Sequence, residues 1–220
     1  MKKVQKLVLC LSSLILLSSC SRDYYNAYYD MSLNIDLPTK INKELGSKTK
    51  MDLTDKGKDY FNYEDKDFSI AIKPSNIGFN FKIQNKTDDT IKIIWDNSAM
   101  INEDNNTERL LHAGTSYMDG NKTQLPSIIV KHTSILEYVA PQNSLRMNDG
   151  EWSTESYFVS TVFGKNIDVK ALALKQEMVL KNRFKNRIIK LLLPIEINNK
   201  ISYYTFNFKV DDVNFDFNEK

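Results

Sequence analysis

Short runs of alternating apolar and polar side chains occupy the central part of the chain. The clearest are residues 68–72 and 77–83, in which every second residue is apolar. This period of two is typical of a strand that buries one face. A polar turn at residues 86–89 is followed by a further apolar run, so the pattern predicts a β-hairpin over residues 76–95.

Further runs of the same kind predict strands at residues 127–131, 134–139, 157–163, 188–197 and 201–210. The pair Asn198-Asn199 separates the last two runs and suits a two-residue turn that needs positive φ. Pro194 lies inside the run before it and predicts an edge strand or two strands with a kink, because proline cannot donate to a ladder.

This order of strands, with a turn signal about every 8–12 residues, predicts a mainly β fold over residues 59–220. It resembles an immunoglobulin-like antiparallel β-sandwich in architecture, although the Cys and Trp signature of true immunoglobulin domains is missing. One segment departs from the pattern. Residues 169–181 are rich in strong helix formers and predict one short helix that covers an end of the sandwich. Its Val169, Leu172, Gln176 and Val179 fall near one face of that helix.

The first twenty residues follow the tripartite pattern of an export signal. Three lysines precede the apolar run at residues 7–17, which is too short to span a bilayer. Leu17-Ser18-Ser19-Cys20 then resembles the lipobox of bacterial lipoproteins. The resemblance implies that residues 1–19 are removed and that Cys20 is lipidated and becomes the mature N-terminus. A plain secretory signal and an uncleaved anchor are the alternatives.

Residues 20–58 lack a clear period and mix tyrosine, asparagine, aspartate and lysine. We interpret them as a tether between the lipid and the domain, because such a composition buries too little to offset the entropy of ordering. The tyrosine pairs at residues 24–25 and 28–29 are the exception. They either dock on the domain or lie at the level of the lipid headgroups.

Charge and cysteine content narrow the function further. The full chain has 30 basic and 28 acidic groups, and loss of the three lysines of the signal leaves 27 against 28. A nucleic-acid footprint is therefore not expected; the basic stretch at residues 181–187 is interpreted as a solvated face or a protected strand edge. Besides Cys10 in the signal, Cys20 is the only cysteine, which excludes an internal disulfide and cysteine catalysis in the mature chain.

Motifs for catalysis, cofactors or metals are not found in the sequence. His112 and His132 are far apart, and the acidic pairs Asp88-Asp89 and Asp211-Asp212 are typical of turns. The loop at residues 102–108 is rich in oxygen ligands but lacks the glycine of a calcium loop, so a polar hairpin loop is the better interpretation. We therefore predict no enzyme activity, no cofactor and no metal.

A candidate binding patch is formed by Trp152 and Tyr157, which follow Asp149-Gly150 and are freer to be exposed than the rings of the alternating strands. The sequence thus predicts a lipid-anchored protein of the bacterial cell envelope, with the outer membrane favoured, facing the periplasm or the surface. Its domain would be a non-catalytic interaction or structural module with an envelope protein partner. Surface adhesion or soluble-ligand binding, and hydrolysis of an envelope polymer, are the alternatives.

Overall fold

The computed structural model describes residues 24–37, 47–52, 60–113, 115, 122–148, 151–154, 156–158, 161–163 and 169–217. Its strands are β1 (Tyr24–Asp36), β2 (Ser47–Asp52), β3 (Phe61–Glu64), β4 (Phe68–Pro74), β5 (Phe79–Asn85), β6 (Ile91–Ile93), β7 (Ala99–Ile101), β8 (Thr107–His112), β9 (Ser127–Ile129), β10 (Ser134–Pro141), β11 (Leu145–Asn148), β12 (Glu151–Thr154), β13 (Thr161–Phe163), β14 (Ile188–Ile197) and β15 (Lys200–Phe217). The helical elements are the α-helix α2 (Val169–Phe184) and the short 3-10 helices η1 (Trp95–Asn97) and η3 (Gln142–Ser144).

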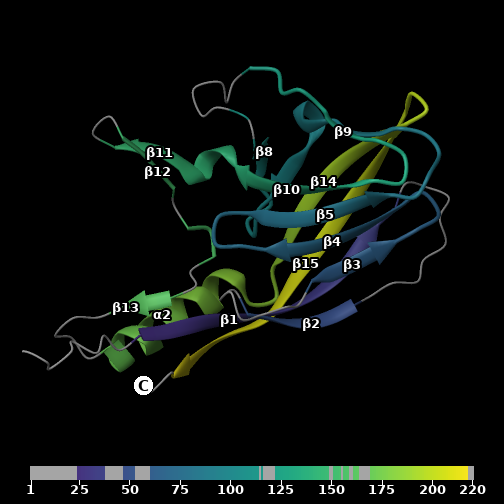
Figure 1. The fold of residues 1–220 in the computed structure, drawn as a ribbon. Helices are drawn as coiled ribbons and strands as arrows, with labels where there is room; N and C mark the ends of the chain where they lie inside the picture. Colours follow the sequence, from purple (N-terminus) through teal and green to yellow (C-terminus); the bar gives the residue numbers. More distant parts are fainter. Residues whose placement is uncertain are drawn as a thin grey trace, which may run out of the picture.

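Thirteen of these strands form one antiparallel sheet that curls back towards itself. Its main path runs β13-β1-β15-β14-β7-β8-β10-β5-β4-β3, and β11 and β12 form a separate pair. The curl brings the half that contains β3, β4, β5 and β10 in front of the half that contains β1, β14 and β15 (Figure 1). The prediction of a mainly β, antiparallel fold with one helix is confirmed, and the sheet is nearly barrel-shaped.

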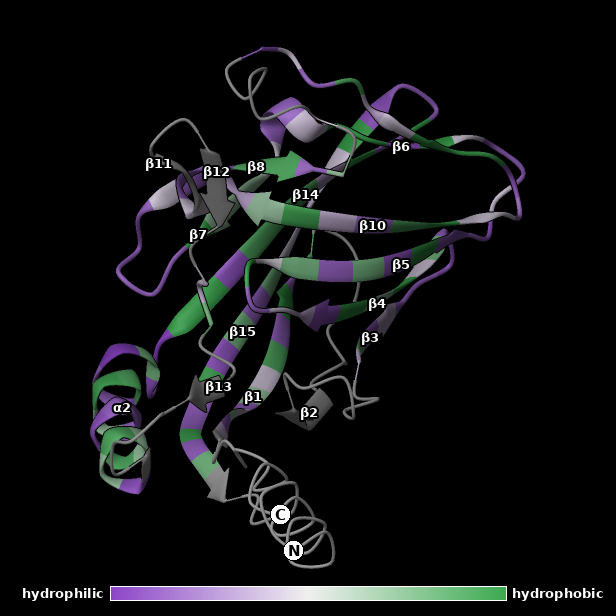
Figure 2. Ribbon diagram, turned by 60° about the vertical axis from the view of Figure 1, so that its left-hand side comes forward, coloured by the Kyte–Doolittle hydropathy of each residue, from purple (hydrophilic) through white to green (hydrophobic). Residues whose placement is uncertain are grey.

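Aromatic side chains fill the space between the two halves. Phe208 of β15 meets Phe61 of β3 at 5.4 Å and Phe79 of β5 at 5.0 Å between ring centroids. Tyr204 meets Phe68 of β4 at 4.9 Å. Except for Phe61, these rings come from strands predicted by alternation, and Figure 2 shows the matching bands of apolar and polar residues along β15. The core therefore lies between layers that are far apart in sequence.

The N-terminal strand β1 corrects the predicted tether. Residues 24–36 pair with β15 over nearly their whole length, and β2 pairs with the other edge of β1. Ala27, Tyr29, Met31 and Leu33 are buried. Residues 24–36 therefore belong to the same sheet as the strands after residue 59, because the partner strand β15 supplies the burial that the local composition does not.

The predicted hairpin over residues 76–95 is wrong. β5 pairs with β4 and β10, whereas β6 pairs with β9 and β14. Between them the chain crosses from one half of the sheet to the other, fixed by the buried Asn85. The Asn85 side-chain amide donates to the carbonyls of Asp89 at 2.7 Å and Ile129 at 3.0 Å. These bonds direct the chain towards β9 rather than back along β5.

Strand β14 accommodates Pro194 in the interior of the sheet and not at an edge. It pairs with β15 throughout, and on its other side with β7 and then β6. The short helix η1 lies between β6 and β7 in the chain, so the ladder on this side of β14 has a gap next to Pro194. There the Pro194 carbonyl accepts a hydrogen bond from the Ile94 N–H at 3.0 Å. The missing proline N–H therefore falls where no ladder bond is needed. The turn after β14 is as predicted, with φ of 52° and 60° at Asn198 and Asn199.

The predicted helix is confirmed and extends to Phe184. It packs against β1, β13 and β15 at one end of the molecule (Figure 1). The buried face carries Ala173, Leu180 and Phe184, whereas Val179 is exposed. The face predicted from residues 169, 172, 176 and 179 is therefore rotated from the observed one.

Candidate functional site

Strand β10 separates two contrasting sites, because its neighbouring side chains point to opposite faces of the sheet. Leu136 lies on the outer face and is 81% exposed. Glu137 lies on the inner face, where its side chain is only 10% exposed. An apolar residue outside and a carboxylate inside reverse the usual pattern of a half-buried strand, so each face is a candidate site.

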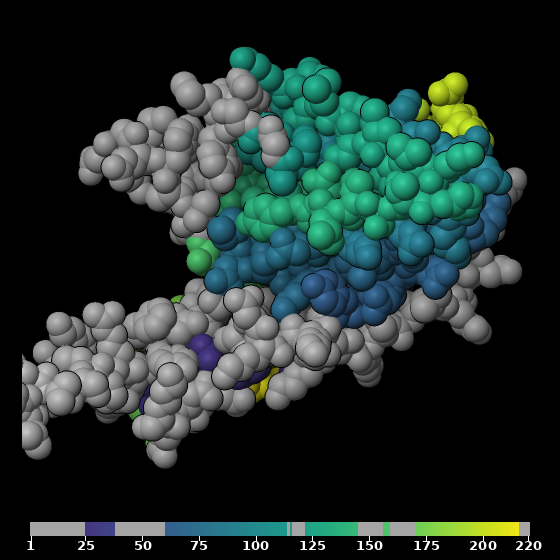
Figure 3. Space-filling view, viewed as in Figure 1, coloured from purple at the N-terminus to yellow at the C-terminus, as the bar shows by residue number. Residues whose placement is uncertain are grey.

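The outer site is a groove across β4, β5 and β10. The strand register places Lys82 of β5 between Ala71 of β4 and Leu136 of β10. Tyr138 lies one row further along β10, and Tyr60 closes the groove directly before β3. Figure 3 shows this face, on which the green-teal residues of β10 lie against the blue residues of β3 to β5.

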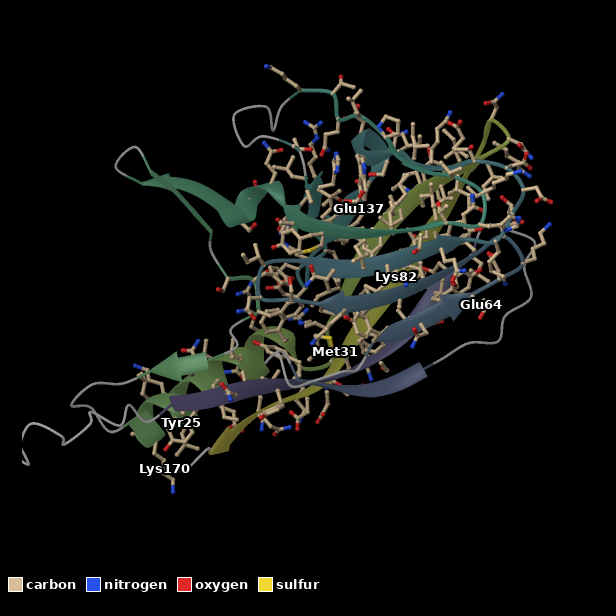
Figure 4. All side chains as sticks on the ribbon, viewed as in Figure 1. Tyr25, Met31, Glu64, Lys82, Glu137 and Lys170 are labelled. Atoms are coloured by element: carbon tan, nitrogen blue, oxygen red, sulfur yellow. The ribbon has the colours of Figure 1, made fainter. Side chains whose placement is uncertain are left out.

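The small side chain of Ala71 explains why this face is hollow. Longer side chains from Tyr60, Lys82, Leu136 and Tyr138 surround it, and the enclosed space is about 570 Å³. Two charged residues line the groove, Lys82 and Glu137. The register places Lys82 beside Leu136 on the outer face and Glu137 beside the buried Phe81 on the inner face. Figure 4 labels Lys82 near the middle of the outer face. The groove therefore combines apolar walls with one cation, a composition that suits an apolar side chain next to an acidic or carbonyl group.

The inner site is a chain of polar contacts behind β10. The Trp95 indole N–H donates to the Ser127 hydroxyl at 2.9 Å, and that hydroxyl in turn donates to the Glu137 carboxylate. The second Glu137 oxygen lies 3.9 Å from His112 Nδ1. Trp95 is fully buried and stacks on the His112 ring at 4.8 Å between centroids. Four polar side chains from η1, β8, β9 and β10 thus meet inside the fold.

His112 is held in its neutral form by these surroundings. Burial lowers its pKa below the ordinary 6.5, although the nearby Glu137 carboxylate and a bond with the Ala113 backbone act in the opposite direction. Its Nδ1 is buried and has no hydrogen-bond partner. The ring is stacked on the Trp95 indole, and its Nδ1 does not form a hydrogen bond with the Glu137 carboxylate.

The inner cluster contains the residue types of an acid–base site, but in a different arrangement. A serine nucleophile needs a base within hydrogen-bond reach, and here the Ser127 hydroxyl bonds to Glu137 and not to His112. Glu137 and His112 are both largely enclosed, with 10% and 14% of their side chains exposed. The geometry is that of a hydrogen-bonded polar network within the core.

Of the two residues of the predicted binding patch, Trp152 and Tyr157, the structure describes the side chain of Tyr157 alone, and it buries that side chain. Trp152 lies on β12, and its side chain is outside the described residues. Tyr157 is 8% exposed. Its hydroxyl donates to Glu103, which also binds the Arg183 guanidinium. Burial and the bond to Glu103 raise the pKa of Tyr157.

The contacts of Tyr157 explain why it is buried. Its ring meets Phe158 and Phe184 at 4.8 and 5.7 Å. The Arg183 guanidinium lies 5.2 Å from the Tyr157 ring centroid. Helix α2 supplies Phe184 and Arg183, and the sequence gives no sign that α2 folds onto this segment.

The remaining candidates from the sequence lie apart. His132 Nε2 forms an exposed hydrogen bond with the Asp88 carboxylate at 2.9 Å, not with a residue of the inner cluster. The loop at residues 102–106 is the turn of the β7–β8 hairpin, as predicted. Among the described residues no group of three His, Cys, Asp or Glu side chains is placed to hold a metal ion.

Two further facts concern the membrane. In the described part of the chain, no helix has both the length and the apolar composition to cross a bilayer. The predicted lipidation site Cys20 and the signal at residues 1–19 lie outside the described residues.

Sequence reasoning missed both faces of β10. The segment Ile135, Leu136, Glu137, Tyr138, Val139 offers apolar residues to either face, so alternation alone does not decide which side is buried. The one available signal is the acidic residue within an apolar strand. No protein family, curated protein or solved structure matches this chain. The geometry of the two sites therefore carries the functional argument.

Proposed function

We propose that this protein is a lipid-anchored component of the bacterial cell envelope whose β domain binds a partner protein through the outer groove. The observation that carries the binding role is Leu136, a large apolar side chain that stays 81% exposed beside a hollow of about 570 Å³. Exposed apolar surface next to a concave site is a feature of protein interaction sites. Lys82 favours a partner segment that places an acidic group beside its apolar side chain.

The anchor half of the proposal rests on the lipobox-like sequence before Cys20. The groove and the N-terminal end of the described chain lie apart in Figure 4, where Lys82 is near the middle of the front face and Tyr25 is at the lower end. A lipid near Tyr25 would leave the groove accessible. Tethering would then raise the local concentration of the domain, so that a weak contact in the groove is sufficient. The outer membrane remains the favoured site.

The anchor is tested by the intact mass of the protein extracted from membranes. We expect a chain that starts at Cys20 and carries a diacyl or triacyl increment. A Cys20→Ala variant is the control and should lose both the increment and the detergent partitioning. An unmodified wild-type chain in the soluble fraction would overturn the anchor and leave the groove to serve a secreted domain.

The groove is tested by photo-crosslinking of the full chain in intact cells. A photoreactive amino acid replaces Tyr60, which lines the groove, and in a matched strain it replaces Ile128, which is 58% exposed and lies outside it. We expect one discrete adduct from position 60 and none of that size from position 128. Ala71→Arg should remove the adduct because it fills the hollow. Equal labelling from both positions would contradict a specific site.

A polymer hydrolase is the second candidate, and the approach of His112 to Glu137 at 3.9 Å beside Ser127 is the observation that favours it. Its test is release of soluble fragments from purified cell-wall polymer by the full chain. Glu137→Gln should abolish release if this candidate is correct, whereas Glu64→Gln on the exposed edge should not. Our proposal of a non-catalytic role expects no release from the wild type.

The finer fold assignment is also a proposal. The facing layers with an aromatic core support an immunoglobulin-like sandwich, although one continuous sheet supplies both layers. Surface adhesion and capture of a soluble ligand would use the same groove. The crosslinking experiment separates them from an envelope partner, because a small ligand yields no protein adduct.

A further inference from the structure

Helix α2 carries apolar side chains on both of its faces. Its inner face packs on the sheet through Ala173, Leu180 and Phe184. On the outer side, Leu174 and Met178 are one turn apart and are 52% and 61% exposed. The inner face is accounted for by the fold, whereas the outer pair contacts no other part of the described chain closely enough to be covered.

Positive charge surrounds these outer residues. Between residues 169 and 187 the chain carries six basic side chains and one acidic side chain, Glu177. Lys175 lies between Leu174 and Met178 in sequence and is exposed. Lys181 and Lys185 are partly neutralised by Glu177 and Asp212. Exposed apolar side chains beside lysines can bind an anionic membrane surface, because the apolar atoms are buried in the interface and the lysines are attracted to anionic lipid.

The position of α2 relative to the anchor adds an independent argument. Only three residues separate Cys20 from Tyr24, the first residue of β1. Four residue steps of extended chain reach at most about 14 Å. Helix α2 packs against β1 at this same end, and Figures 1 and 2 both place α2 beside the start of β1. Figure 4 labels Tyr25 and Lys170 close to each other there.

We propose that the outer face of α2, formed by Leu174, Lys175 and Met178, lies on the anionic surface of the membrane that holds the lipid of Cys20. This inference rests on the proposed lipid anchor. The short link holds the helix near the headgroups, where Leu174 and Met178 enter the interface and Lys175 meets anionic lipid. The contact fixes the orientation of the domain and directs the groove away from the bilayer.

The test places an environment-sensitive fluorophore on the membrane-facing residue. In the full lipidated protein Cys10 is removed and Cys20 is blocked, so a Met178→Cys variant offers one reactive thiol. The labelled protein is inserted into vesicles of phosphatidylethanolamine and phosphatidylglycerol. An Ile201→Cys variant at the opposite β14–β15 turn is the matched control.

We expect a blue shift of the emission from position 178 and loss of its fluorescence to nitroxide-labelled lipid, with neither change at position 201. Lys175→Glu, or vesicles of phosphatidylcholine alone, should reduce both changes at position 178. Vesicle-bound protein whose label at position 178 stays in water overturns the inference and leaves the anchor intact. Protein that does not float with vesicles and lacks the acyl mass overturns the anchor itself and the inference with it.

Discussion

The two faces of β10 differ in the burial and the contacts of their side chains. On the inner face, Glu137 joins Ser127, Trp95 and His112 in a polar network that the fold encloses. On the outer face, Leu136 is exposed to solvent beside a groove. A buried carboxylate persists where hydrogen bonds compensate for its lost hydration, whereas an exposed leucine contributes little to folding. The enclosed network on the inner face therefore contributes to stability, whereas the exposed Leu136 is the basis of the binding role that we propose for the outer face.

The largest effect on stability is expected from substitution of Trp95, which is fully buried and contacts both His112 and Ser127. Trp95→Ala leaves a cavity and frees the serine hydroxyl. We expect the free energy of unfolding to fall by about 3–5 kcal/mol, measured by urea denaturation of the purified domain. A loss similar to that of an exposed residue would contradict the assigned packing.

The next largest effect is expected at Glu137. Glu137→Ala removes the acceptor of the Ser127 hydroxyl and leaves a buried donor unpaired, so unfolding should become easier by about 1–3 kcal/mol. The controls are the single variant Ser127→Ala and the double variant that combines Ser127→Ala with Glu137→Ala. If the network is real, the two single losses will not add, because each removes the same bond.

The pH dependence of stability is expected to follow His112. Its pKa is lowered in the folded state, so below the ordinary value of about 6.5 the unfolded chain binds a proton that the folded chain does not. The free energy of unfolding should therefore fall as the pH decreases from about 6.5 towards the lower folded pKa. His112→Gln should flatten this part of the curve, measured by denaturation at successive pH values. The exposed His132 provides the comparison, and a curve that flattens equally in His132→Gln would argue against this assignment.

The smallest effect on stability is expected on the outer face. Leu136→Asp replaces a side chain that the fold does not bury, so its unfolding free energy should stay within about 0.5 kcal/mol of wild type. Thermal unfolding of the two proteins under one set of conditions checks this. A large loss of stability would mean that Leu136 is part of the core and would remove the contrast between the faces.

Local pattern was enough to predict several elements of the fold. The strong helix formers of residues 169–181 gave α2, and Asn198-Asn199 gave the two-residue turn, since asparagine tolerates positive φ. The alternation in residues 68–72 and 77–83 gave β4 and β5. In each case the deciding interaction lies within a few residues along the chain.

Long-range pairing explains what the sequence did not show. β1 was interpreted as part of a tether, although Tyr25, Ala27, Tyr29, Met31 and Leu33 do alternate. Their polar neighbours lower the mean hydropathy. The burial comes mainly from pairing with β15, which is about 170 to 190 residues away by register. The burial of Tyr157 likewise depends on α2, which reaches it through Arg183 and Phe184.

The candidate site was less predictable than the fold for a related reason. A groove arises from side chains of the three strands β4, β5 and β10, from Tyr60 before β3, and from the small size of Ala71 between them. The alternation of residues in β10 does not show which face is buried, because both faces carry apolar residues. The sequence did predict an anchor at Cys20, which lies outside the described residues and remains a prediction.

The most direct measurement of the central claim is the yield of the adduct from a photoreactive residue at position 60, compared between Leu136→Asp and Ile128→Asp in the full chain. Both changes place a charge at an exposed apolar position, but only Leu136 lines the groove. We predict that Leu136→Asp abolishes the adduct while the folded protein remains at its normal level, and that Ile128→Asp preserves it. Equal adduct yields in the two variants would contradict the outer face of β10 as the binding site.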